Sequence, residues 1–115
     1  MSRRLGAQAE DQAAAHLERL GYRIVARNVS FKGGELDLVA IHAGTLCFIE
    51  VRARARADYG SADETIGPTK RRRLILAAQQ FLARWRDPST PCRFDVVAIG
   101  PDGVRVVKDA FDAGS

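Results

Sequence analysis

The sequence predicts an α/β sandwich in which helices flank a mixed β-sheet of about five strands. Two stretches place apolar residues three and four positions apart, as in an amphipathic helix, and other stretches are rich in the β-branched and aromatic residues of strands. Their order along the chain is α-β-β-β-α-β-β. Because 115 residues leave no room for a second core, residues 1–115 are expected to form one domain.

The first helix is expected over residues 3–20, with Gly21 as its C-terminal cap. The apolar residues of its buried face recur every three or four positions: Leu5, Ala9, Ala13, Leu17 and Leu20. Residues 22–31 then form a strand, which ends at the Lys32-Gly33-Gly34 turn.

Two further strands are expected over residues 35–41 and 45–52, joined by a short linker that contains Ala43-Gly44. The second of them is apolar on both faces from Leu46 to Ile49, which is typical of a strand at the centre of a sheet. Residues 53–67 are polar and irregular, and a loop of this length suggests a function.

The second helix is expected to begin at Gly67-Pro68, where a missing N–H costs nothing, and to end at Asp87-Pro88-Ser89. Its apolar residues show the clearest helical period in the chain: Leu74, Ala77, Ala78, Phe81, Leu82 and Trp85. Arg93 to Ile99 and Val104 to Val107 complete the sheet as a hairpin across Pro101-Asp102-Gly103.

Composition argues against membrane insertion and against secretion. The longest apolar runs have four or five residues, whereas a membrane-spanning helix needs about 20. Polar residues interrupt the N-terminal region, so no signal peptide is expected. Cys47 and Cys92 have no second metal ligand nearby and are expected to be reduced thiols in the core, which predicts a cytoplasmic protein.

The positive charge of the chain is concentrated in its middle third. Residues 52–93 carry ten basic and four acidic side chains, a net charge of +6, whereas residues 1–51 are neutral and residues 94–115 carry −2. A clustered positive field suggests a polyanionic partner. The alternative is an ordinary solvated basic surface.

Three acidic residues interrupt strands that are otherwise apolar: Glu35, Asp37 and Glu50. Because side chains alternate along a strand, Glu35 and Asp37 are expected on one face. Glu50 and Arg52 share a face for the same reason. An even-numbered turn between the two strands would place Asp37 opposite Glu50, and Glu35 opposite Arg52. An odd-numbered turn would put the two sets on opposite faces.

In the even register the Cβ atoms of Asp37 and Glu50 would be about 4.5–5.5 Å apart. Two carboxylates inside a sheet repel each other unless a cation lies between them. Mg²⁺ suits such a site, since it takes one or two carboxylates, keeps several waters and binds phosphate. The alternative is a simple ion pair of Glu50 or Glu35 with Arg52, although the apolar flanks make uncompensated charge costly there.

An aspartate and a Glu-x-basic motif on adjacent strands, preceded by a helix that carries a glutamate, resemble the PD-(D/E)xK nuclease superfamily, in particular its archaeal Holliday-junction-resolvase branch. The whole chain resembles the YraN-like family of small predicted bacterial endonucleases. This resemblance implies a restriction-endonuclease-like sandwich. The residues that carry it extend over nearly the whole chain: Gly6, Glu10, Gly21-Tyr22, Arg27-Asn28, Gly34-Glu35-Leu36-Asp37-Leu38, Phe48-Ile49-Glu50-Val51-Arg52, Lys70, Arg93-Phe94-Asp95-Val96 and Ala110-Phe111.

The resemblance also implies roles for the acidic residues. Asp37 and Glu50 would be ligands of Mg²⁺ or Mn²⁺, with the carbonyl of Val51 as a third ligand. Glu10 would be the helix carboxylate that holds a water of the metal or a second ion. Glu35 is an accessory candidate.

The chain departs from the superfamily pattern at two places. Arg52 stands where the pattern has lysine, and no proline stands directly before Asp37. A guanidinium effectively never loses its proton, so Arg52 cannot be a general base. Its planar fork can still orient an attacking water or stabilise charge on a phosphate.

The basic residues are candidates for contact with nucleic acid. Arg54 and Arg56 would extend the face that carries the acidic pair, if the strand continues. Residues 70–73 put four cations in the first turns of the second helix, where they oppose the helix macrodipole, so phosphate contact explains them better than solubility does. Lys70 and Arg71 point toward the apolar stripe and therefore toward the expected site.

The leading hypothesis is a metal-dependent endonuclease that hydrolyses phosphodiester bonds in DNA, including branched DNA. One alternative is a non-catalytic nucleic-acid-binding module that keeps the nuclease fold, and another is a structural protein with ion-paired carboxylates. Metal-dependent cleavage separates the first from the second, and salt-dependent DNA binding separates both from the third. RNA in place of DNA, and a homodimer that makes two cuts, are open at this stage.

Overall fold

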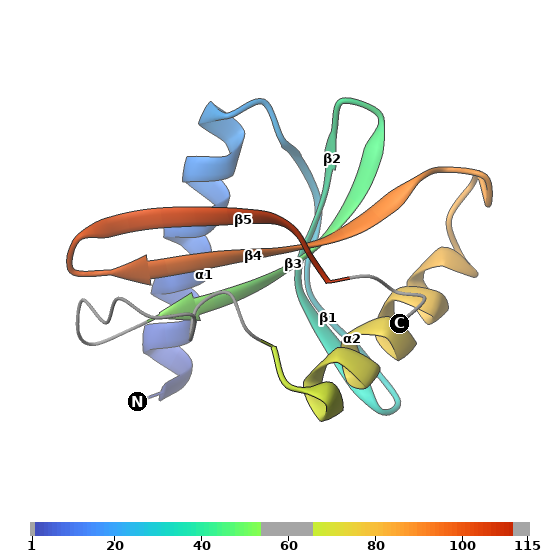
Figure 1. The fold of residues 1–115 in the computed structure, drawn as a ribbon, viewed down its shortest axis with the longest axis horizontal. Coiled ribbons are helices and arrows are strands. Elements are labelled where there is room, and N and C mark those ends of the chain that lie inside the picture. The colour runs from blue at the N-terminus through green and yellow to red at the C-terminus, as the bar shows by residue number, and fades with distance from the viewer. Residues whose placement is uncertain (1, 54–65, 112–115) are drawn as a thin grey trace.

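The computed structural model describes residues 2–53 and 66–111 and shows the α/β architecture expected from the sequence (Figure 1). The order α-β-β-β-α-β-β is confirmed. The elements are α1 (Ser2–Arg19), β1 (Arg23–Phe31), β2 (Gly34–His42), β3 (Thr45–Ala53), α2 (Pro68–Leu82), β4 (Cys92–Gly100) and β5 (Gly103–Phe111).

The five strands in the described part of the chain form one mixed sheet in the order β1-β2-β3-β4-β5. β3 and β4 are parallel, and all other neighbours are antiparallel. α2 lies between β3 and β4 in the sequence and supplies the crossover that parallel strands require (Figure 1).

The turn between β2 and β3 has the even length on which the site depends. Ala43 and Gly44 form it, both with positive φ angles, 50° and 81°. Two such residues are typical of the tight turn that matches the twist of a hairpin. The ladder then runs from His42↔Thr45 to Leu38↔Ile49, which sets Asp37 beside Glu50 in the register expected for an even turn.

The two helices pack on opposite faces of the sheet, as the two groups of buried residues show (Figure 1). One core lies under α1 and includes Ala13, Leu17, Leu38, Ala40, Cys47 and Ile49. The other lies under α2 and includes Val39, Leu46, Phe48, Leu74, Ala77 and Phe94. β3 contributes to both cores, so its expected central position is confirmed.

β5 is longer than the expected strand over Val104 to Val107. It continues to Phe111, which pairs with Phe94. A bulge follows Phe94, where the N–H of Asp109, at a φ of 53°, donates to Oδ1 of Asp95 at 2.9 Å. The polar residues at the bulge concealed this part of the strand from a reading of hydrophobic patterns.

Two smaller expectations are corrected. Cys47 is buried, but Cys92 is exposed at the start of β4, so the prediction of two core thiols is wrong for Cys92. Both thiols are free. The regular part of α2 ends at Leu82, and Trp85 lies half-buried in the turn that follows rather than in the helix.

Candidate functional site

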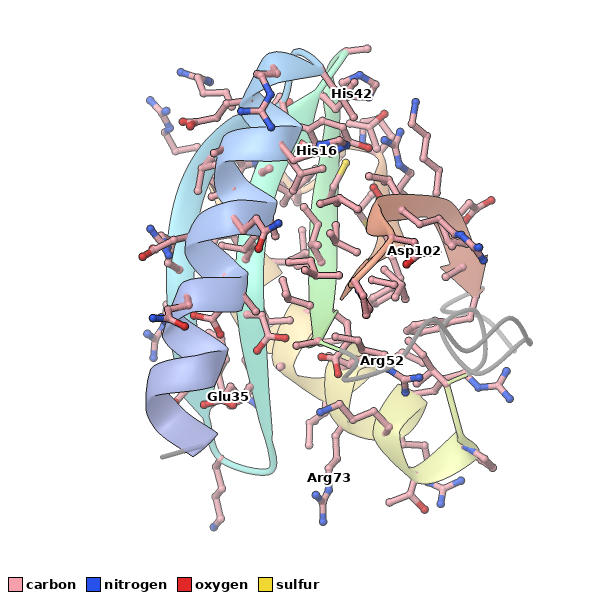
Figure 2. All side chains as sticks on the ribbon, turned by 90° about the vertical axis from the view of Figure 1, so that its left-hand side faces the viewer. His16, Glu35, His42, Arg52, Arg73 and Asp102 are labelled. Carbon is pink, nitrogen blue, oxygen red and sulfur yellow. The ribbon has the colours of Figure 1, made fainter. Side chains whose placement is uncertain are left out.

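Asp37 lies where β2 and β3 stop pairing. The last ladder pair is Leu38↔Ile49, and one step further the backbone N–H of Val51 donates to Oδ2 of Asp37 at 2.9 Å. Figure 2 shows the two strands diverging toward the end of the sheet at which Arg52 is labelled. The Asp37 side chain thus accepts a hydrogen bond that, in a regular ladder, a backbone carbonyl of β2 would accept.

The alternation of side chains along β2 changes at Asp37. Gly34 faces α2, since a Cβ on Gly34 would lie 2.3 Å from the carbonyl oxygen of Arg73. Leu36 also belongs to the core under α2, whereas Leu38 belongs to the core under α1. Asp37 is therefore at a local twist between the two faces of the sheet.

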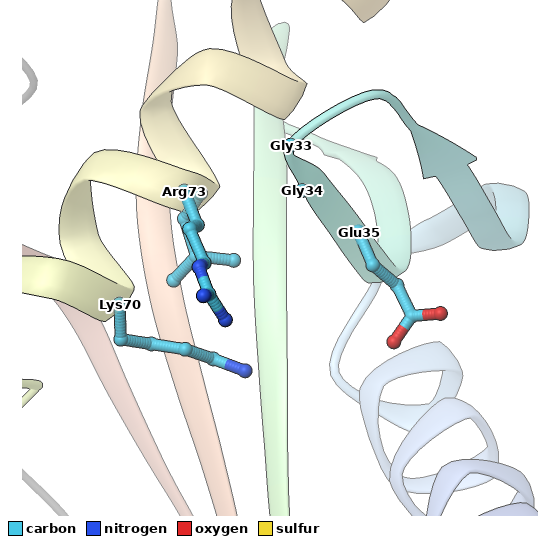
Figure 3. A pocket seen from close by; sticks show the side chains of 6 residues that line it. Gly33, Gly34, Glu35, Lys70 and Arg73 are labelled. Atoms are coloured by element: carbon cyan, nitrogen blue, oxygen red, sulfur yellow. The ribbon is translucent and has the colours of Figure 1, made fainter.

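Glu35 is turned away from the basic helix, because it alternates with Gly34 and Leu36, which both face α2. Figure 3 shows its carboxylate directed toward α1 rather than toward Lys70. Its ladder partner is Ser30 of β1, whose Oγ donates to Oε2 of Glu35 at 3.4 Å. The prediction that Glu35 lies opposite Arg52 is wrong, because the β2–β3 ladder ends before it reaches Glu35. That Glu35 and Asp37 share a face stays a prediction, and the charges of both raise the pKa of Glu10 on α1.

Glu50 is a buried carboxylate between Asp37 and α2. Its side chain is 10% exposed, and its Oε2 lies 3.3 Å from Nζ of Lys70, whose side chain is 49% exposed. Burial and, after it, the charge of Asp37 raise the pKa of Glu50 to about 7, although the ammonium of Lys70 acts in the opposite direction. One ammonium therefore does not fully compensate the two carboxylates.

Glu10 approaches the same region from α1. It is half-buried, and burial raises its pKa; a hydrogen bond with Asn28 opposes the shift, and the charges of Asp37 and Glu35 add to it. Asn28 itself has a positive φ of 52°, on the stretch of β1 beside Asp37. The charge of Asp37 therefore acts on Glu10, and the role of Glu10 at the site stays a prediction.

The donor set suits a hard cation with few protein ligands. Among residues 2–53 and 66–111, no three His, Cys, Asp or Glu side chains converge closely enough to hold a metal ion. Asp37 and Glu50 are the closest acidic pair at the site, and Mg²⁺ needs only one or two carboxylates. Oδ2 of Asp37 accepts the N–H of Val51, and the carboxylate keeps lone pairs that a cation can use.

Four cations occupy the first two turns of α2 without any acidic residue in the first turn. Lys70 reaches Glu50, as its expected orientation toward the site requires. Arg71 is half-buried, and its Nε is buried with no hydrogen-bond acceptor among the described residues. A buried donor of this kind is costly to leave unpaired.

Arg52 lies two positions after Glu50 on β3, half-buried and on the same face by strand alternation. Arg54 and Arg56, the other predicted contacts of nucleic acid, lie outside the described residues. The role of the Val51 carbonyl stays a prediction, and the structure adds a role for the N–H of the same residue.

A cavity of about 240 Å³ opens beside the carboxylate pair, between α2 and the β1–β2 turn. Lys70 and Arg73 extend into this space from α2, and the Gly33-Gly34 backbone closes it from the other side (Figure 3). The absence of a side chain at Gly34 lets the turn approach α2 this closely. Sequence analysis assigned no individual role to Arg73.

A second polar cluster was missed by the sequence analysis. Asp95 is 1% exposed and accepts hydrogen bonds from Tyr22 Oη at 3.2 Å and from Arg93 Nε at 3.0 Å. Arg93 also lies 3.1 Å from Nδ1 of His42, which stacks on Tyr22. Figure 2 places His42 at the opposite end of the sheet from Arg52 and Arg73. The sequence feature that could have revealed this cluster is Asp95 itself, an acidic residue within the apolar run from Phe94 to Ile99.

No helix in the described part of the chain is long and apolar enough to cross a membrane.

The chain is similar to several curated bacterial proteins over almost its whole length. A UPF0102 protein of Cupriavidus taiwanensis is 53% identical over 94% of this chain and 82% of the relative. UPF0102 proteins of Paracidovorax citrulli and Symbiobacterium thermophilum are 48% and 47% identical, each over 98% of this chain and over 86% and 100% of the relatives.

A family model also matches residues 9–99, a range that includes α1 from Ala9 onward, the carboxylate pair and the basic helix. The match therefore covers most of the chain and the whole candidate site. The resemblance to the YraN-like family is confirmed at this level, and the chain belongs to the uncharacterised protein family UPF0102.

Proposed function

We propose that this protein is a metal-dependent endonuclease that hydrolyses phosphodiester bonds in DNA. The observation that carries the proposal is the Asp37–Glu50 pair, two carboxylates where β2 and β3 stop pairing, with one ammonium, Lys70, paired to them among the described residues. Such a pair retains negative charge for which a divalent cation is the natural partner. The four cations of α2 lie directly beside it, where a polyanionic substrate would bind.

Each residue of the site would have a distinct role. Asp37 and Glu50 would hold Mg²⁺ or Mn²⁺, with the N–H of Val51 keeping the Asp37 carboxylate in place. A bound cation of this kind activates water and stabilises the departing oxygen in phosphodiester hydrolysis. Arg52, on the face of Glu50, would orient the phosphate and stabilise its charge without exchanging a proton. Glu10 would position water from the α1 side.

A second candidate function is nucleic-acid binding without cleavage. Arg52 favours it, because the superfamily that the chain resembles has a lysine at this position and a guanidinium cannot take over proton transfer. The same cations of α2 would serve either function. The two candidate functions differ in whether the carboxylate pair catalyses hydrolysis of the phosphodiester bond.

The deciding experiment measures nicking of duplex, forked and four-way-junction DNA with Mg²⁺ or Mn²⁺, against an EDTA control. We expect cleavage by the wild type and none by Asp37→Ala. Asp11→Ala is the matched control, since Asp11 is an exposed aspartate that pairs with Arg27 on the surface, and it should cleave normally. Salt-sensitive DNA binding without metal-dependent cleavage would establish the binding module, and cleavage that persists in Asp37→Ala would identify a contaminant.

A further inference from the structure

Lys70 belongs to two neighbouring sites at once. Its ammonium lies 3.3 Å from Oε2 of Glu50, and the same side chain lines the cavity beside the carboxylate pair. Glu50 is held in the sheet, whereas the side chain of Lys70 is half exposed and extends from the first turn of α2. The pair therefore joins a fixed carboxylate to a cation that is free to change partner.

Arg73, one helical turn after Lys70, provides a second cation in this cavity (Figure 3). Its guanidinium makes no hydrogen bond or ion pair with any other residue in the described ranges. Two cations, Lys70 and Arg73, thus border this space, and Glu35, the one acidic residue among the described residues that line it, directs its carboxylate toward α1 (Figure 3).

We infer that this cavity is a phosphate subsite, which binds the backbone phosphate next to the bond that is cut, and that Lys70 moves from Glu50 to this phosphate when a divalent cation takes its place. The inference rests on the proposed function. In the metal-free protein, the ammonium of Lys70 supplies the positive charge that Glu50 needs. A divalent cation at Asp37 and Glu50 competes with that ammonium, because both require the same carboxylate.

Lys70 then supplies the ammonium that the strand lacks at Arg52. Lys70 would hold the substrate in place, since its ammonium exchanges an ion pair with a carboxylate of the protein for one with a phosphate of the nucleic acid. Metal and DNA would therefore bind cooperatively, because each favours the released state of Lys70, and the coupling must be equal in both directions.

The first test measures Mn²⁺ binding to the DNA-free protein by electron paramagnetic resonance of the free ion. Lys70→Met should bind Mn²⁺ about three- to tenfold more tightly than the wild type, because the competing ammonium is gone. Arg73→Met should bind Mn²⁺ as the wild type does, since Arg73 makes no contact with Glu50. Arg86→Met, which removes an exposed cation beyond the other end of α2, should also leave Mn²⁺ affinity unchanged.

The second test measures binding of a fluorescent DNA duplex by anisotropy, with and without Mn²⁺, after a gel has shown the duplex intact. Lys70→Met and Arg73→Met should each flatten the plot of log affinity against log salt by about one unit, and Arg86→Met should not. The gain in DNA affinity that Mn²⁺ produces should be at least halved in Lys70→Met and kept in Arg73→Met.

Lys70→Met thus has opposite effects on two ligands, tighter for the metal and weaker for DNA, which a purely structural ion pair would not produce. Unchanged or weaker Mn²⁺ affinity in Lys70→Met would overturn the inference while leaving the proposed function standing. A wild type that binds no Mn²⁺ would overturn both. Circular dichroism of Lys70→Met, with Lys70→Gln as a second variant, separates these outcomes from loss of folding.

Discussion

Oδ2 of Asp37 accepts a hydrogen bond from the backbone N–H of Val51, across the point at which β2 and β3 cease to pair. This bond brings the Asp37 carboxylate next to Glu50 even though no ladder pair joins the two residues. An asparagine at this position would keep the acceptor, because its side-chain carbonyl can accept the same N–H. The charge of Asp37 can therefore be removed without losing its geometry.

Asp37→Asn is expected to stabilise the metal-free protein, by up to about 1 kcal/mol, because it removes the charge that opposes ionisation of Glu50. It should also abolish the rise in melting temperature that Mg²⁺ or Mn²⁺ produces in the wild type, since that rise requires binding to the folded state. Thermal unfolding with EDTA and with each cation measures both effects. A large loss of stability without metal would instead indicate that Asp37 is one half of a buried ion pair.

The stability of the metal-free protein should fall as pH rises from about 4.5 to about 7. Burial raises the pKa of Glu50 to about 7 in the folded state, above its ordinary value of 4.5. In this window the folded chain keeps a proton that the unfolded chain has released, so rising pH favours unfolding, by about 2–3 kcal/mol in total. Urea unfolding in EDTA across this range should show a decline in the wild type relative to Glu50→Gln. Equal slopes in the two proteins would contradict the prediction.

Asp95 is expected to be among the most costly acidic residues to replace, although it lies far from the candidate site. Its carboxylate is buried, paired with Arg93 and bonded to Tyr22 and to the N–H of Asp109. Asp95→Ala should reduce the free energy of unfolding by about 3–5 kcal/mol, since it leaves the Arg93 charge without its partner. Asp11→Ala, which removes an exposed ion pair, should cost less than about 1 kcal/mol. Comparable losses in the two variants would show that the cluster is not a structural anchor.

The sequence was sufficient to predict the order of the elements, because helical and strand periods depend on local spacing. The register of β2 and β3 was predictable only as two alternatives, and the positive φ angles of Ala43 and Gly44 select the even one. The twist at Asp37 was not predictable from strand alternation, and nor was the packing of the nearby Gly34 against the backbone of Arg73 on a distant helix. Contacts over such separations leave no periodic signal in the sequence.

The candidate site, too, was predictable only where it depends on local rules. Asp37 and Glu50 could be paired from strand alternation and turn length, which are local rules. The Lys70–Glu50 ion pair could not, since it depends on where the crossover returns α2 to the sheet. The Asp95 cluster joins Tyr22 and Asp95 across 73 positions, and only the acid in an apolar strand indicated that a partner must exist.

The last prediction concerns Arg52, which stands on β3 where the related nuclease pattern has lysine. A guanidinium effectively never loses its proton, so in a cleavage reaction the proton of the attacking water cannot go to Arg52. Arg52 would then contribute charge and orientation alone. Arg52→Lys should therefore keep measurable cleavage, because a cation stays on the face that carries Glu50.

Arg52→Met should reduce cleavage by about 10²- to 10³-fold, the range for loss of one electrostatic stabiliser, while Mn²⁺ affinity is largely kept. Rates for the wild type and both variants, measured across pH at saturating Mn²⁺, should show no acidic limb that depends on residue 52. If Arg52→Met cleaved at the wild-type rate while Asp37→Ala stayed inactive, Arg52 would have no part in the reaction. The electrostatic role would then fall to the cations of α2, with Lys70 first among them because it already contacts Glu50.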